Sequence, residues 1–208
     1  MEDVLSVYER PYDPLLPVVC IDESSKQLVG HTRARLPAQP GSPEIWDYEY
    51  RRNGVADVFM IFEPLGSRRH VQVTKTRTRL DFAECLRYTS DVMYPHVEKI
   101  VLVMDNLNTH SLGSLYEAYQ PEEARRLADR FEVHYTPKHG SWLDMAEIEL
   151  GVLKRQCLSG RIATIEEMER EIRAWEFERN KRCLTVNWQF TTVDARIKLQ
   201  RLYPKFSN

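Results

Sequence analysis

Two short apolar runs, each followed by an aspartate, constrain the fold of this 208-residue chain more than any other feature. Residues 17–21 (PVVCI) precede Asp22, and residues 100–104 (IVLVM) precede Asp105. Runs this short and this continuous predict strands that are buried on both faces. Such strands need helices on both sides of the sheet, so the sequence predicts an α/β fold.

The rest of the chain predicts one domain with a mixed sheet. Further strands are expected over residues 55–62 and 70–74, joined as a hairpin, and over residues 131–135. Helices are expected over residues 79–93, 112–119 and 121–130, around Glu147, and from Thr164 to about Arg179. We expect residues 1–16 to be a lead-in or linker and residues 17–208 to form the domain, with an irregular loop over residues 36–50.

Composition narrows the class of protein. The chain is 42% hydrophobic and 29% charged, which is typical of a globular protein of one domain. It has no apolar stretch that could span a membrane and no signal peptide, so we expect a cytoplasmic protein with no membrane partner. A net charge of −2 argues against a dedicated nucleic-acid-binding protein. A catalytic domain can still contact DNA through local basic patches while another domain supplies the affinity.

Three carboxylates form the candidate site. An unpaired carboxylate at the end of a buried strand is costly unless a cation compensates it. On adjacent parallel strands, Asp22 and Asp105 would emerge side by side at the sheet edge where α/β folds bind ligands. Glu147, near the start of a predicted helix, adds a third carboxylate. Each residue alone is better explained as a turn former, a cap or a solvated acid, but together they predict a site for two Mg²⁺ ions and phosphodiester chemistry.

Other polar residues near this set are candidates for contacts with substrate. Asn108 and His110 lie in the polar loop after Asp105, where His110 could contact substrate or support a metal ligand. Lys138 and His139 precede the helix of Glu147 and could face a scissile phosphate. All four roles are expectations from position in the sequence.

Several segments, in this order, resemble the catalytic domain of bacterial insertion-sequence transposases of the mariner superfamily. They are VVCIDE (18–23), LVMDNLNTH (102–110), HYTPKHGSWLDMAE (134–147) and VNWQFTTVDARIKLQRLY (186–203). The resemblance implies a ribonuclease H-like mixed sheet flanked by helices, with Asp22, Asp105 and Glu147 as a DDE triad. It also implies DNA strand cleavage and strand transfer that depend on two Mg²⁺ or Mn²⁺ ions.

The chain departs from that family in two respects. Asp144 occupies a position where family members usually carry asparagine, so an extra acid is expected beside the site. The N-terminal helix-turn-helix region that recognises transposon ends is not found, which suggests a split-frame product, a truncation or an excised domain. The expected partners are therefore DNA (transposon ends and target) and either a second copy or a chain carrying the helix-turn-helix region. The main alternative function is an inactive remnant that binds DNA or full-length transposase and modulates transposition; a stand-alone nuclease is a further alternative.

Overall fold

A five-stranded sheet forms the centre of the computed structural model, which describes residues 1–33, 38–43, 48–138 and 140–203. The strands are β1 (Val18–His31), β2 (Tyr50–Glu63), β3 (Arg68–Thr74), β4 (Ile100–Met104) and β5 (Phe131–Tyr135). Their order across the sheet is β3-β2-β1-β4-β5. The first three strands are antiparallel neighbours, whereas β4 and β5 run parallel to β1. The mixed sheet and the β2–β3 hairpin predicted from the sequence are thereby confirmed.

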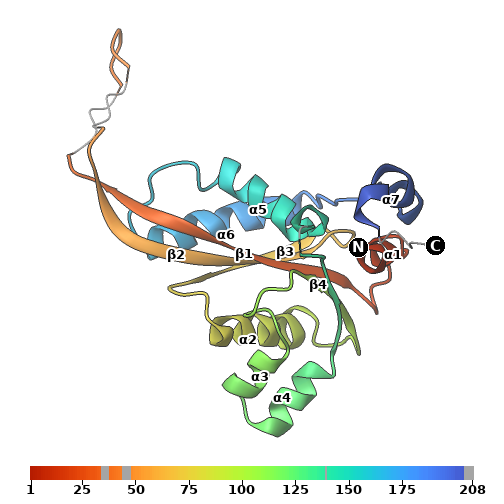
Figure 1. Cartoon of the computed structure of the whole chain (residues 1–208). Helices are drawn as coiled ribbons and strands as arrows, with labels where there is room; N and C mark the ends of the chain where they lie inside the picture. Colours follow the sequence, from red (N-terminus) through yellow and green to blue (C-terminus); the bar gives the residue numbers. More distant parts are fainter. Residues whose placement is uncertain (34–37, 44–47, 139, 204–208) are drawn as a thin grey trace.

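Strand β1 is longer than the sequence predicts. Its parallel pairing with β4 ends at Ile21, opposite Met104, but its antiparallel pairing with β2 continues to His31. The two strands run on beyond the sheet as a ribbon (Figure 1). Asp22 therefore lies within β1 rather than at its end, which corrects our expectation. The apolar pattern misses the extension because the second half of β1 is no longer covered on both faces.

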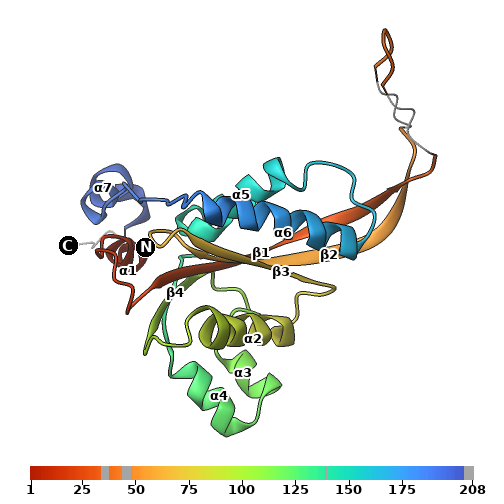
Figure 2. The same cartoon turned by 180° about the vertical axis from the view of Figure 1, so that it is seen from behind.

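Helices cover both faces of the sheet. One face carries α2 (Arg79–Tyr88), the π-helical turn η1 (Thr89–Met93), α3 (Gly113–Ala118) and α4 (Pro121–Ala128). The other carries α5 (Met145–Gln156) and α6 (Ile165–Lys181), as Figures 1 and 2 show. Alternate strand residues enter two separate cores, Ile21 on the α2 side and Cys20 on the α5 side. In the described part of the chain, no helix is both long and apolar enough to cross a membrane.

The helix expected over residues 79–93 changes its hydrogen-bonding pattern near its end. The backbone N–H of Tyr94 donates to the carbonyl of Thr89, which closes a π-turn. This wider turn rotates the following side chains, so that Val92 is 50% exposed while Met93 is buried. The prediction of one regular helix over residues 79–93 was therefore wrong at its C-terminal end, because the helical period changes there.

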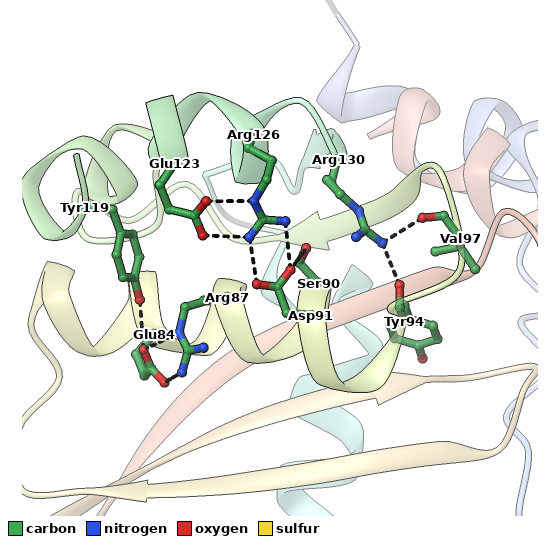
Figure 3. Close-up of polar contacts among 10 residues, drawn as sticks. All are labelled: Glu84, Arg87, Ser90, Asp91, Tyr94, Val97, Tyr119, Glu123, Arg126 and Arg130. Carbon is green, nitrogen blue, oxygen red and sulfur yellow. Dashed lines mark hydrogen bonds and ion pairs between the residues drawn. The ribbon is translucent and has the colours of Figure 1, made fainter. Parts of the chain in front are cut away.

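Arginines of the α4 region attach it to the end of this helix (Figure 3). Arg126 donates to Asp91 at 2.7 Å and to Glu123 at 2.7 Å. Arg130 donates to the carbonyl of Tyr94 at 2.6 Å. These contacts hold the segment that leads from β4 back to β5, and so help to position both parallel strands.

The N-terminal segment forms a helix that the sequence analysis did not predict. Helix α1 (Glu2–Tyr8) buries Val4, Leu5 and Val7 completely and lies beside α7 (Thr192–Lys198), as Figure 1 shows. Seven residues are too few for a clear helical period, which explains the omission. The Tyr8 hydroxyl donates to the carbonyl of Leu143 at 2.7 Å. Helix α1 thereby supports the short 3-10 turn η2 (Ser141–Leu143) that leads into α5.

Candidate active site

Asp22 and Asp105 lie side by side at the point where the parallel pairing of β1 with β4 ends. The β1–β4 pairing ends with Ile21 opposite Met104, and the two aspartates are the next residue on each chain segment. Cys20, two residues before Asp22 on β1, packs in the core on the α5 side. Side chains alternate along a strand, so Asp22 also faces the α5 side of the sheet.

The environment of Asp22 favours an added cation. Burial raises the pKa of Asp22 to about 6. The charge of Asp105 adds to this rise, whereas a 2.8 Å hydrogen bond from the backbone N–H of Glu23 opposes it. Two carboxylates close enough to repel one another, with one of them poorly solvated, form an arrangement that a divalent cation would stabilise.

His110 lies between the carboxyl groups of Asp105 and Glu23. Its Nδ1 contacts Asp105, its Nε2 contacts Glu23, and its side chain is fully buried. A ring placed between two carboxyl groups is in an environment that favours its protonated, positively charged form. Burial by itself would lower the pKa of His110, but the bonds to Asp105 and Glu23 outweigh it and raise the pKa to about 9.

The other residues proposed to contact substrate lie in the loops that follow β4 and β5. Asn108 and Lys138 are exposed in the loops after β4 and β5. His139 lies outside the described residues. Buried as it is, His110 fits a role beneath the carboxylates better than a contact with substrate. Glu23 was not predicted to belong to the site. Its position directly after Asp22 on a strand could have indicated a carboxylate on the other face of the sheet.

Glu147 lies in the first turn of α5, on its solvent-exposed side. The residues that α5 buries are Met145, Ala146, Glu149, Leu150 and Leu153. Ile148, the residue after Glu147, also lies on this outer side and is 42% exposed rather than packed on the sheet. Within the described residues, no group of three or more Asp, Glu, His or Cys is already gathered to hold a metal. Glu147 is thus at this end of α5 but is not clustered with Asp22 and Asp105.

The extra acid, Asp144, caps α5 and is buried beside the site. Its side chain is 1% exposed and accepts a 2.8 Å hydrogen bond from the backbone N–H of Ala146. Burial, and then the charge of Asp22, raise the pKa of Asp144 well above its ordinary value. A raised pKa favours the neutral carboxyl group, whose charge matches that of asparagine. The Tyr8 hydroxyl contacts both Cys20 Sγ, at 3.5 Å, and the Leu143 carbonyl, at 2.7 Å, so the start of α5 lies close to the part of β1 that carries Asp22.

Glu149 has a structural role on the other side of α5. It accepts hydrogen bonds from Arg179 at 2.6 and 2.9 Å and forms an ion pair with Arg69 at 3.0 Å. Arg69 is itself fully buried and donates to the carbonyl of Leu184 at 2.6 Å. This cluster joins α5, β3 and α6, so Glu149 supports the helix that carries Glu147.

Solved structures with a similar fold include three complexes of one transposase. They are the Mos1 transposase paired-end complex with left transposon end (17% identity, TM-score 0.56) and the Mos1 mariner paired-end complexes with Mn (17%, 0.54) and with Mg (18%, 0.54). Each alignment covers 87% of this chain, but only 55%, 55% and 58% of the respective Mos1 chains. This chain therefore spans little more than half the length of those proteins. At these identities the matches show the fold, which is that of a ribonuclease H-like catalytic domain, as expected.

Comparison by sequence gives the family. No curated protein matches this chain. Residues 17–169, which include both aspartates and Glu147, match the model of the DDE superfamily endonucleases. This match confirms the expected DDE endonuclease family, and the similar structures agree with the expected fold. The chain belongs to the DDE superfamily endonuclease family.

Proposed function

We propose that this chain is the catalytic domain of a mariner-type DDE transposase that cuts DNA strands and joins the freed ends to target DNA. The observation that carries the proposal is the placement of Asp22 and Asp105 side by side at the edge of the parallel strands. Helix α5 begins close to this pair, with its cap Asp144 beside Asp22, and we propose that it supplies Glu147 as the third carboxylate. The membership in the DDE endonuclease family supports this reading.

Asp22, Asp105 and Glu147 are the residues that would hold two Mg²⁺ or Mn²⁺ ions. Carboxylate oxygens are the ligands that such ions prefer, and the raised pKa of Asp22 marks an electrostatic cost that a cation relieves. Glu147 is exposed, so its side chain is free of the packing that holds Glu149 in place. When bound, such ions activate the attacking hydroxyl and stabilise the leaving oxygen. That Mos1 complexes contain Mn or Mg supports the choice of metal.

The exposed residues around the edge would orient DNA. Lys138 follows β5 and Asn108 follows β4, so both lie in loops at the end of the sheet that carries the aspartates. We propose that they, together with His139, contact the phosphate backbone next to the scissile bond. We further propose that this domain acts on transposon ends and target DNA either together with a second copy or together with a partner chain that carries a helix-turn-helix region.

The test is cleavage and joining of DNA by purified protein in Mg²⁺ or Mn²⁺, with supercoiled plasmid and with oligonucleotides that end in a free 3′-hydroxyl. We expect activity in the wild type and only background in Asp105→Asn, which removes a ligand charge at nearly constant volume. Asp129→Asn is the matched control, because Asp129 is exposed at the opposite end of the parallel strands. Full activity of Asp105→Asn would refute the assigned site. Nicking without joining would favour a stand-alone nuclease. DNA binding without nicking or joining would favour an inactive remnant that modulates transposition.

A further inference from the structure

A buried chain of three side chains links the two strands that carry the aspartates. His110 contacts Asp105 through Nδ1 and Glu23 through Nε2, and its side chain has no exposed surface. The Glu23 side chain is only 5% exposed. We propose that Glu23 and His110 are a positioning pair that fixes the Asp105 carboxylate for metal binding, an inference that rests on the function proposed above.

The strand geometry explains why this pair is separate from the ligands themselves. Asp22 and Glu23 are consecutive on β1, so their side chains point to opposite faces of the sheet. Asp22 faces the α5 side, whereas Glu23 lies on the α2 side with His110. The His110 ring packs against Phe82 of α2, with 4.7 Å between the ring centroids. The pair therefore lies on the face of the sheet opposite the proposed ligand Glu147.

The contacts on Asp105 constrain the orientation of its carboxyl group. His110 engages Oδ1, and the backbone N–H of Leu107 donates to the same oxygen at 3.3 Å. The Asp105 side chain is 27% exposed, so it reaches the surface while one of its oxygens is held from below. The position of Oδ2 follows from these contacts, and a ligand oxygen held in place loses less conformational freedom when a metal binds.

Glu23 in turn holds the imidazole ring. The charged groups around the ring are Asp105, Glu23 and, beyond Glu23, Arg77, whose guanidinium lies 3.8 Å from the Glu23 carboxylate. With both nitrogens engaged and one ring face on Phe82, the imidazole has a single orientation. This arrangement distinguishes a positioning residue from a DNA contact, because the ring has no atom left to offer to a phosphate.

Two substitutions at position 110 separate the contacts of the two nitrogens. In His110→Asn the amide nitrogen lies close to the place of Nδ1, so a donor to Asp105 is kept and the contact with Glu23 is lost. In His110→Gln the amide nitrogen lies close to the place of Nε2, so the contact with Asp105 is lost. Glu23→Gln keeps the volume of Glu23 but removes the charge that orients the ring.

The measurement is the Kd for Mn²⁺ by calorimetry on the intact chain, with thermal unfolding without metal as a check of folding. We expect His110→Gln to raise the Kd about 10- to 100-fold, and His110→Asn and Glu23→Gln to raise it less. His134→Gln is the matched control. His134 also bridges two carboxylates, Asp3 at 2.8 Å and Glu132 at 2.9 Å, and on β5 it pairs with Val103 rather than with either aspartate. Its Kd should equal that of the wild type.

The outcomes separate this inference from the proposed function. If Asp105→Asn weakens Mn²⁺ binding while His110→Gln and Glu23→Gln bind as the wild type does, the positioning role is refuted and the metal site stands. If the wild type does not bind Mn²⁺, or Asp105→Asn binds it equally well, the metal site fails and the positioning role with it. In DNA cleavage, a positioning role lowers kcat and leaves KM for DNA unchanged. A raised KM for DNA at constant kcat would make His110 a DNA contact and overturn the inference.

Discussion

Two glutamates on α5, only two positions apart, should respond in opposite ways to the same substitution. Glu149 is 1% exposed and bonded to Arg69 and Arg179, whereas Glu147 faces solvent at the candidate site. The change to glutamine removes one negative charge and keeps the side-chain volume in both cases. Glu149→Gln should therefore lower stability, and Glu147→Gln should abolish metal-dependent DNA cleavage without lowering stability.

The size of the stability effect follows from the burial of the arginines. Removing one partner of a buried ion pair costs about 3–5 kcal/mol, because a buried charge is left uncompensated. Arg69 is fully buried, but Arg179 is 15% exposed and recovers some hydration, which places the cost near the lower limit, about 3 kcal/mol. In a chain of this length each kcal/mol lowers Tm by roughly 2–4 °C, so we expect a fall of about 6–12 °C. Glu147→Gln should stay within about 0.5 kcal/mol of the wild type.

Urea and thermal unfolding followed by circular dichroism measure the first effect, and plasmid nicking at a temperature where both variants are folded measures the second. A Glu149→Gln protein as stable as the wild type would refute the argument from the buried arginines. A folded Glu149→Gln protein without activity, beside an active Glu147→Gln protein, would reverse the assignment of the third catalytic carboxylate.

Three further predictions concern the surroundings of the site. Asp144→Asn should raise Tm more at pH 8 than at pH 4. The pKa of Asp144 is higher in the folded protein than in the unfolded chain, so the wild type loses stability as the pH rises above the pKa of an ordinary aspartate. An equal gain in Tm at both pH values would contradict this. Affinity for Mn²⁺ should fall about tenfold from pH 7 to pH 5 by calorimetry, because a pKa of about 6 leaves Asp22 mostly protonated at the lower pH; a constant Kd would exclude Asp22 as a ligand. Tyr8→Phe should cost about 1 kcal/mol in urea unfolding, by removing the hydrogen bond to the Leu143 carbonyl; no loss would show that α1 does not support the start of α5.

Much of the fold follows from local patterns in the sequence. The strand over residues 131–135 was predicted with its observed limits, and the apolar run over residues 100–104 coincides with β4. Thr164 accepts a hydrogen bond from the backbone N–H of Glu167, as the predicted cap at the start of α6 requires. These features depend on residues close together in the chain, so periodicity and capping rules are sufficient to find them.

Other features depend on contacts between residues far apart in the chain. The extension of β1 beyond Asp22 requires pairing with β2, and the burial of Glu149 requires Arg69 and Arg179 from two other elements. Neither partner can be identified from the residues next to Asp22 or Glu149. For the same reason the structural role of Glu149 could not be predicted from the sequence.

The sequence by itself determined the fold class and the apolar runs that lead to Asp22 and Asp105, because these follow from short local patterns. Only the tertiary structure decided that His110 is buried between Asp105 and Glu23, and that Asp144 is held beside Asp22. The charge and orientation of an ionisable side chain depend on burial and on neighbouring charges, which come from distant parts of the chain. Those quantities are set only when the sheet and its helices have packed together.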